Sequence, residues 1–188
     1  MSLHELTLLL VRHGQATHNL PDKEKVLQWG EAGELDTELT DLGQRQAELV
    51  AKRLRDTVFQ LAVSSHLKRA RDTARAILEE QGEGQELEQW EVVRERNMGK
   101  LLEEDRELRA AQWTVEAAIK DRSLLTWRPP GGESVVELNC RVSKFLDLVM
   151  SRTTAMDVEN PTVLVVTHGL FMREVYRCLY TVLCRLLP

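Results

Sequence analysis

The amino-acid sequence predicts an α/β protein with a mostly parallel central sheet. Two observations support this prediction: short apolar runs end at polar or glycine residues, and between these runs the apolar residues recur at helical spacing. Strands that alternate with helices along a chain are typical of parallel sheets, because each crossover helix returns the chain to the starting edge. No repeat or domain-sized linker interrupts the pattern, so we expect a single domain over residues 1–188.

Four apolar runs predict the strands of this sheet. The first and the last consist mainly of Leu and Val and stop at Arg12 and Thr167, as expected for parallel strands buried on both faces. The predicted strands are Leu6–Val11, Phe59–Val63, Trp90–Val93 and Val163–Val166.

Five stretches predict helices, and two of them begin with recognisable capping residues. Thr40 is a favourable N-cap, and Ser134 with Glu137 three residues later has the capping-box pattern. Two further segments, Leu20–Asp36 and Thr126–Gly132, are predicted loops. The predicted helices are about Thr40–Asp56, Leu67–Glu80, Glu103–Lys120, Ser134–Arg152 and Leu170–Leu183.

Composition and charge narrow the class of protein. The formal net charge is -5, whereas nucleic-acid-binding proteins usually carry a basic balance, so no nucleic-acid partner is expected. The apolar runs are too short to cross a bilayer, and the N-terminus lacks a signal-peptide pattern, so no membrane association is expected. The three cysteines have no metal-ligand spacing and cannot all pair. A reducing cytoplasmic location is therefore predicted, without a metal site.

Polar side chains suited to phosphate chemistry follow each predicted strand. Arg12 and His13 follow the first strand, and His168 follows the last. Arg69 lies at the start of the helix after the second, and Glu95 comes shortly after Val93. Ligands of open α/β sheets bind outside the carboxyl ends of the strands. The sequence therefore predicts one site that contains all five side chains.

These residue types match the requirements of phosphoryl transfer. The charge of a transferring phosphoryl group is spread over its equatorial oxygens, and catalysis depends mainly on positioning and electrostatic stabilisation. Arg12 and Arg69 can each bind two oxygens through a planar guanidinium, and His168 can donate to the same group. A neutral His13 can attack phosphorus, and Glu95 can protonate the leaving alkoxide.

The order of these motifs along the chain resembles that of the histidine phosphatase superfamily, the phosphoglycerate mutase-like proteins. Its signature is matched by Arg12-His13-Gly14 followed by Asn19. Other blocks of the family are matched, in the family's order, by residues 36–47, 64–74, 95–99, 129–134 and 167–169. The resemblance thus covers nearly the whole chain and implies a three-layer sandwich with helices on both faces of the sheet.

The resemblance also implies a role for each site residue. It assigns the nucleophile to His13, the proton donor to Glu95 and the phosphate ligands to Arg12, Arg69 and His168. Asn19 and Gly169 match auxiliary substrate-binding positions. The phosphatase branch of the family needs no metal or organic cofactor.

Other residues of possible interest stay outside this set. His18 and His66 are lone histidines, which we place outside the essential residues. Trp29, Trp127 and Arg128 either line a substrate pocket or cover the core.

The leading functional prediction is a phosphomonoesterase that acts on a small phosphorylated metabolite, such as a sugar phosphate, through phospho-His13. The family's mutases carry a longer insertion in the region between Gly99 and Pro129, and a short segment favours access of water. One alternative is a bisphosphoglycerate-dependent phosphoglycerate mutase. Another is a phosphoprotein-binding protein or a protein phosphatase. The sequence carries no signal for the oligomeric state.

Overall fold

The central feature of the fold is a parallel sheet with the strand order β1-β4-β2-β3. The computed structural model describes residues 5–21, 35–82, 84–99 and 125–186. Within these ranges all strand pairs are parallel, and the order means that β4 enters the sheet between β1 and β2. The strands are β1 (Thr7–Arg12), β2 (Leu61–Ser64), β3 (Leu87–Gln89) and β4 (Thr162–Thr167).

Three of the four predicted strands are confirmed, and the prediction for Trp90–Val93 is wrong. The strand in this region is β3, which ends at Gln89. It pairs with β2 only as far as Ser64, whose carbonyl accepts the N–H of Trp90 at 2.9 Å. Since β2 ends there, the following residues have no neighbouring strand and form a short 3₁₀ helix, Glu91–Val93. Val93 is fully buried although it lies in this 3₁₀ helix. Its burial explains why the apolar run resembled that of a strand.

The helices begin close to their predicted capping residues. Thr40 accepts the N–H of Gly43 at the start of α1 (Asp41–Leu54), and Ser134 with Glu137 forms the predicted capping box of α4 (Val135–Thr154). The other helices are α2 (Lys68–Gln81) and α5 (Gly169–Leu186). The predicted helix Glu103–Lys120 and most of the loop Leu20–Asp36 lie outside the described residues.

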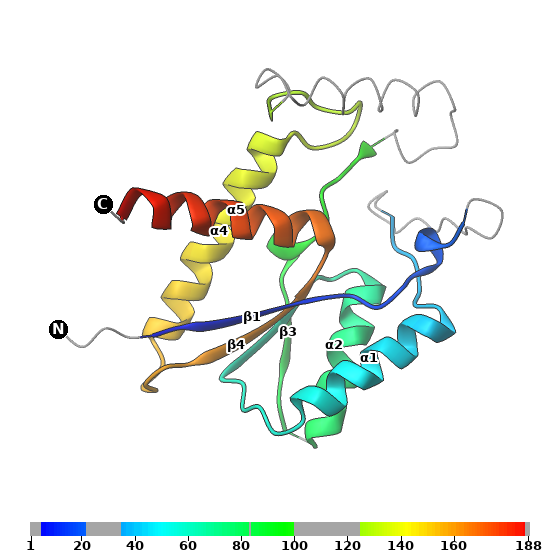
Figure 1. Ribbon diagram of the computed structural model, residues 1–188, viewed down its shortest axis with the longest axis vertical. Coiled ribbons are helices and arrows are strands. Elements are labelled where there is room, and N and C mark those ends of the chain that lie inside the picture. The colour runs from blue at the N-terminus through cyan, green and yellow to red at the C-terminus, as the bar shows by residue number, and fades with distance from the viewer. Residues whose placement is uncertain (1–4, 22–34, 83, 100–124, 187–188) are drawn as a thin grey trace.

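The helices cover the sheet from both sides, which confirms the three-layer sandwich (Figure 1). Along β4, Val163 and Val165 pack against α4 and α5, and Leu164 and Val166 pack against α1 and α2. All four side chains are fully buried, because successive residues of a central strand point to opposite layers. Within the described ranges, no helix has both the length and the apolar character needed to cross a membrane.

The cap of α1 provides a test of the fold. Thr40 Oγ1 accepts the Gly43 N–H at 3.1 Å and donates to Oε1 of Gln15 at 2.8 Å, which ties the helix to the loop after β1. We expect Thr40→Ala to lower the free energy of unfolding by about 1 kcal/mol, because a helix N–H loses its acceptor. Urea denaturation should show a lower midpoint at an unchanged m value. Thr40→Ser is the matched control, and equal stability of the two variants would contradict the prediction.

Candidate active site

The carboxyl ends of β1 and β4 place two histidines side by side. The two strands are in register up to the pair Arg12 and Thr167, so the residues that follow, His13 and His168, leave the sheet at the same level. The N–H of His13 donates to the carbonyl of Thr167 at 3.0 Å. As a result the two imidazole centroids lie 5.1 Å apart.

The surroundings of His13 leave one ring nitrogen available for attack. The imidazole is buried, and its Nδ1 lies 2.7 Å from the carbonyl oxygen of Gly14. A carbonyl only accepts, so Nδ1 carries the proton and Nε2 keeps its lone pair. Burial lowers the pKa of His13 from 6.5 to about 3, and positive charge on Arg69 and Arg12 acts in the same direction. His13 is therefore neutral at pH 7, as a nucleophile must be.

His168 is a fully buried polar side chain beside His13. It has no exposed surface, and neither ring nitrogen has a hydrogen-bond partner among the described residues. Burial, together with the charge of Arg69, holds the pKa of His168 well below its ordinary value. Buried polar atoms are nearly always hydrogen-bonded, so these two nitrogens indicate a place where a ligand completes the site.

Arg69 supplies a buried positive charge at the same edge. The side chain is only 2% exposed; Nη1 donates to the carbonyl of Leu35 at 2.7 Å, and Nε has no partner within the described part of the chain. Burial lowers the pKa of Arg69 to about 10, against the opposing effect of Glu95 and Asp36, so the group stays charged at pH 7. Asp36 also accepts the N–H of Lys68 at 2.7 Å and thereby caps α2 in the first turn, which carries Arg69.

Arg12, a further predicted ligand, lies at the start of α5. Arg12 is exposed at the end of β1 and lies against Gly169, where an added Cβ would be 3.7 Å from the Arg12 Nε. The N–H groups at a helix N-terminus attract anions, which favours phosphate binding next to Gly169. The Asn19 side chain instead serves its own turn, because its Oδ1 accepts the Ala16 N–H at 3.0 Å.

Glu95 is half-buried and contacts both its own loop and the start of α5. Its Oε1 accepts the N–H of Arg96 at 2.9 Å, and its Oε2 lies 3.4 Å from the N–H of Leu170. Glu95 therefore reaches the N-terminus of α5 although it follows a 3₁₀ helix rather than a strand. The structure thus brings Glu95 to the same end of the sheet as Arg69 and the two histidines.

A cavity of about 790 Å³ includes Arg69 and Glu95 in its wall, whereas Arg12, His13, Asn19 and His168 are not among its lining residues. Sequence reasoning placed His18 and His66 outside the essential set, yet both line this cavity. The His18 ring lies 5.9 Å from that of His13, and its Nδ1 is 2.6 Å from Thr37 Oγ1. The position of His18 within the same motif, five residues after His13, was the signal that could have indicated it. The remaining lining residues are Leu35, Leu67, Gln89, Glu91, Arg94, Arg96, Asn97, Met98 and Leu170.

Two of the three aromatic or basic residues left open by the sequence lie within the described ranges. Neither Trp127 nor Arg128 is among the residues that line the cavity, and Arg128 pairs with Glu137 of α4. The third, Trp29, lies outside the described residues.

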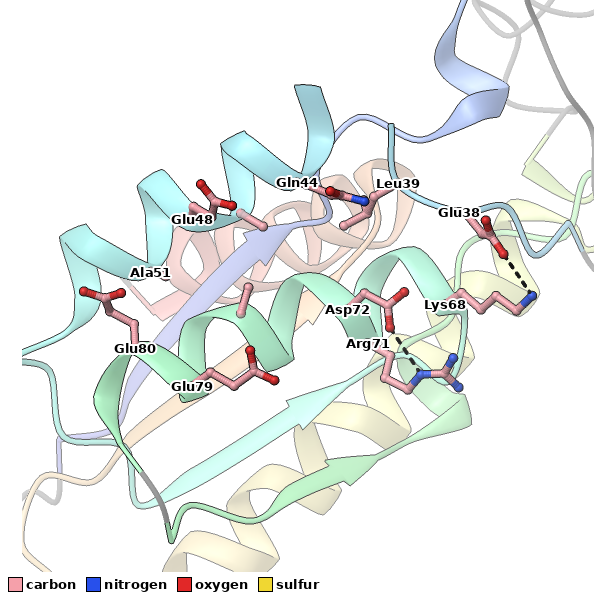
Figure 2. A pocket seen from close by; sticks show the side chains of 12 residues that line it. Glu38, Leu39, Gln44, Glu48, Ala51, Lys68, Arg71, Asp72, Glu79 and Glu80 are labelled. Carbon is pink, nitrogen blue, oxygen red and sulfur yellow. Dashed lines mark ion pairs between the residues drawn. The ribbon is translucent and has the colours of Figure 1, made fainter. Parts of the chain in front are cut away.

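A second depression, of about 740 Å³, lies between α1 and α2 (Figure 2). Charges of both signs line it: Glu48 and Glu79 stand on the two helices, and Arg71 pairs with Asp72 at 3.6 Å. The predicted site residues do not contribute to its wall. Among the described residues, no group of three or more His, Cys, Asp or Glu side chains could hold a metal ion.

Several known proteins resemble this chain over most of its length. Residues 8–183 match the sequence profile of the histidine phosphatase superfamily (branch 1). A 2,3-bisphosphoglycerate-dependent phosphoglycerate mutase from Bartonella tribocorum is 31% identical over 176 residues, which cover 92% of this chain and 81% of the mutase. The solved structure of a mycobacterial glucosyl-3-phosphoglycerate phosphatase is 30% identical with a TM-score of 0.70, over 96% of this chain and 80% of that one. A phosphoglycerate mutase structure from Bacillus anthracis is 27% identical with a TM-score of 0.71, over 95% and 82%.

The lowered pKa of His13 makes stability depend on pH in a defined window. Below about pH 6.5 the unfolded chain binds a proton at this residue, whereas the folded protein does so only near pH 3. The stabilising contribution is complete above pH 6.5 and falls by up to about 1.4 kcal/mol per pH unit as the pH drops through the window. We expect His13→Gln to flatten the curve of unfolding free energy against pH by this slope.

Chemical denaturation at several pH values measures the effect. His168→Gln should flatten the curve in the same direction, because the pKa of His168 is also lowered by burial. Identical pH dependence in the wild-type protein and in His13→Gln would contradict the prediction.

Proposed function

Because the chain belongs to the histidine phosphatase superfamily, branch 1, we propose that it hydrolyses phosphate monoesters of small metabolites through a phosphohistidine at His13. The observation that carries this proposal is the hydrogen bond from His13 Nδ1 to the Gly14 carbonyl, which leaves Nε2 unprotonated in a buried site. The family and the phosphatase enzyme class expected from the sequence are both confirmed by the family match and the solved phosphatase.

Binding of the phosphate group completes the open positions of the site. Its oxygens would accept hydrogen bonds from Arg69, Arg12 and the N-terminus of α5 at Gly169, with Asn19 as a further donor. His168 would donate from one of its unpartnered nitrogens. Donors held in place by the fold need little reorganisation when charge spreads over the phosphoryl oxygens.

The reaction then proceeds in two balanced steps. In the first, the lone pair of His13 Nε2 attacks phosphorus, the ester P–O bond breaks, and the leaving alkoxide takes a proton from the carboxyl of Glu95. In the second, a water molecule attacks phosphorus, the Glu95 carboxylate takes a proton from that water, and the P–N bond breaks. Inorganic phosphate leaves, and His13 and Glu95 return to their starting states.

The cavity supports a leaving group of metabolite size. Its volume of about 790 Å³ lies in the range of small-molecule sites, and its wall combines apolar side chains with arginines. One similar solved structure is a phosphatase of glucosyl-3-phosphoglycerate, a phosphorylated compound that contains a sugar. We therefore propose sugar phosphates and related phosphorylated metabolites as the first substrates to test.

A second candidate is the mutase reaction. The relative from Bartonella tribocorum is named a bisphosphoglycerate-dependent phosphoglycerate mutase, and this name favours the same phosphohistidine chemistry with return of the phosphate to substrate. The two candidates differ in the acceptor of the phosphoryl group: water in the phosphatase, phosphoglycerate in the mutase.

Substitution of the nucleophile tests the shared step. We expect His13→Ala to lower the turnover of an aryl phosphate by at least about 1000-fold, because the covalent route is lost. Arg152→Ala, purified in the same way, controls for contaminating phosphatases. Unchanged turnover in His13→Ala would refute the proposal.

A metabolite panel separates the phosphatase from the mutase. We expect release of inorganic phosphate from at least one phosphorylated metabolite without any bisphosphoglycerate primer. Isomerisation of phosphoglycerate that depends on the primer and is faster than phosphate release would assign the mutase reaction instead.

A further inference from the structure

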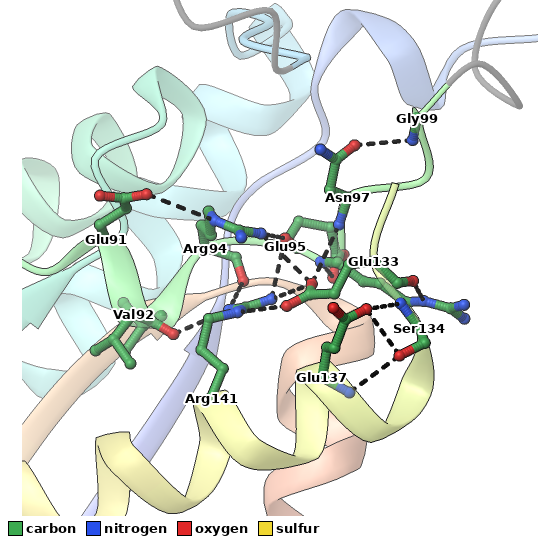
Figure 3. A network of polar contacts seen from close by, with 12 residues as sticks. Glu91, Val92, Arg94, Glu95, Asn97, Gly99, Glu133, Ser134, Glu137 and Arg141 are labelled. Atoms are coloured by element: carbon green, nitrogen blue, oxygen red, sulfur yellow. Dashed lines mark hydrogen bonds and ion pairs between the residues drawn. The ribbon is translucent and has the colours of Figure 1, made fainter. Parts of the chain in front are cut away.

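A buried ion pair near the site joins two residues that the proposed chemistry does not use. Arg141 of α4 forms a two-pronged ion pair with Glu133, with 2.9 Å from Nε to Oε1 and 2.7 Å from Nη2 to Oε2 (Figure 3). The side chains are only 11% and 9% exposed. The guanidinium also lies over the ring of Phe171, 5.3 Å from its centroid. Arg141 therefore has little freedom to move.

The same guanidinium holds the backbone that leads into Glu95. Its Nη1 donates to the carbonyls of Val92 at 2.9 Å and Arg94 at 2.7 Å, and its Nη2 lies 3.4 Å from the carbonyl of Glu95. All three acceptors are backbone atoms within four consecutive residues. Arg141 thus fixes the path of the chain without touching the Glu95 carboxylate.

Glu133 holds the chain on the other side of Glu95. Its N–H donates to the carbonyl of Asn97 at 2.7 Å, and its own carbonyl accepts from Nε of Arg96 at 2.9 Å. Burial alone would raise the pKa of Glu133, but the hydrogen bond and charge of Arg141 outweigh it, so the pKa lies below its ordinary value. The ion pair is therefore charged on both sides at pH 7 and links the segments before and after Glu95.

We infer that Arg141, through its ion pair with Glu133, is a positioning residue that sets the place of the Glu95 carboxyl for proton donation to the leaving group. The inference rests on the proposed phosphatase reaction. A buried ion pair contributes little to stability compared with apolar packing. A role in orientation therefore accounts better for the five contacts that the Arg141 guanidinium donates. Proton transfer needs the carboxyl within hydrogen-bond reach of the leaving oxygen, and a shift of one ångström is costly.

The choice of ester separates positioning of the proton donor from a general structural role. An alkyl phosphate has a poor leaving group that must be protonated as the P–O bond breaks. A dinitrophenyl phosphate has a good leaving group that departs as the anion. Both esters need the same attack by His13, so their ratio of kcat/KM reports on the proton donor.

The variant Arg141→Lys keeps the positive charge and removes the guanidinium fork. We expect it to lower kcat/KM for an alkyl phosphate by about 10- to 100-fold and for dinitrophenyl phosphate by about threefold or less. Glu133→Gln should shift the ratio in the same direction. In a Glu95→Gln background, Arg141→Lys should leave the ratio unchanged, because the group that it positions is already gone.

Arg152→Lys is the matched control. Arg152 lies on the same helix but pairs with Glu88 at the surface, so the ratio should stay at the wild-type value. Circular dichroism and thermal unfolding show that each variant is folded before its kinetics are compared.

Two results overturn the inference. If Arg141→Lys and Glu133→Gln slow both esters in equal proportion, or if Arg141→Lys still shifts the ratio in the Glu95→Gln background, the ion pair does not act through Glu95. In both cases the wild-type protein still hydrolyses the esters, so the proposed function stands. If the wild-type protein hydrolyses neither ester, the proposed function fails, and the role of Arg141 fails with it.

Discussion

The hydrogen bond from the His13 N–H to the Thr167 carbonyl is the constraint on which the site depends. This hydrogen bond continues the parallel pairing of β1 and β4, and it holds His13 and His168 at the same level although they are far apart in the sequence. The register follows from the burial of β4 on both faces, because a slip by one residue would exchange its two sets of buried side chains. The close approach of His13 and His168 is therefore a consequence of core packing.

The same edge of the sheet carries buried polar groups that the protein itself does not satisfy. The nitrogens of His168 and the Nε of Arg69 have no partner among the described residues, and both side chains are almost fully buried. Such groups destabilise a folded protein unless a ligand accepts or donates the missing hydrogen bonds. This cost is typical of preorganised sites, where stability is lower than the fold alone would allow. In the proposed reaction a bound phosphate would offset this cost, and phosphate binding would then be coupled to stability.

Much of the fold could be predicted from the sequence, as could the placement of Arg69, Glu95 and the two histidines at one end of the sheet, because the signals are local. Continuous apolar runs indicated β1 and β4, and capping residues indicated the starts of α1 and α4. The prediction of a strand at Trp90–Val93 was wrong because a strand needs a neighbouring strand to pair with, and β2 ends at Ser64. The roles of Arg141 and Glu133 could not be predicted, because hydrogen bonds to backbone carbonyls depend on the tertiary arrangement and leave no sequence pattern.

We propose that His13 Nε2 becomes covalently bonded to phosphorus during turnover. Rapid quenching of the reaction in alkali preserves phosphohistidine, whose P–N bond is labile in acid, and peptide mass spectrometry then locates the phosphate. We expect a phosphorylated peptide that contains His13, formed within the first turnover and absent from His13→Ala. Turnover of the substrate without any phosphate on His13, or with phosphate on another residue, would contradict it.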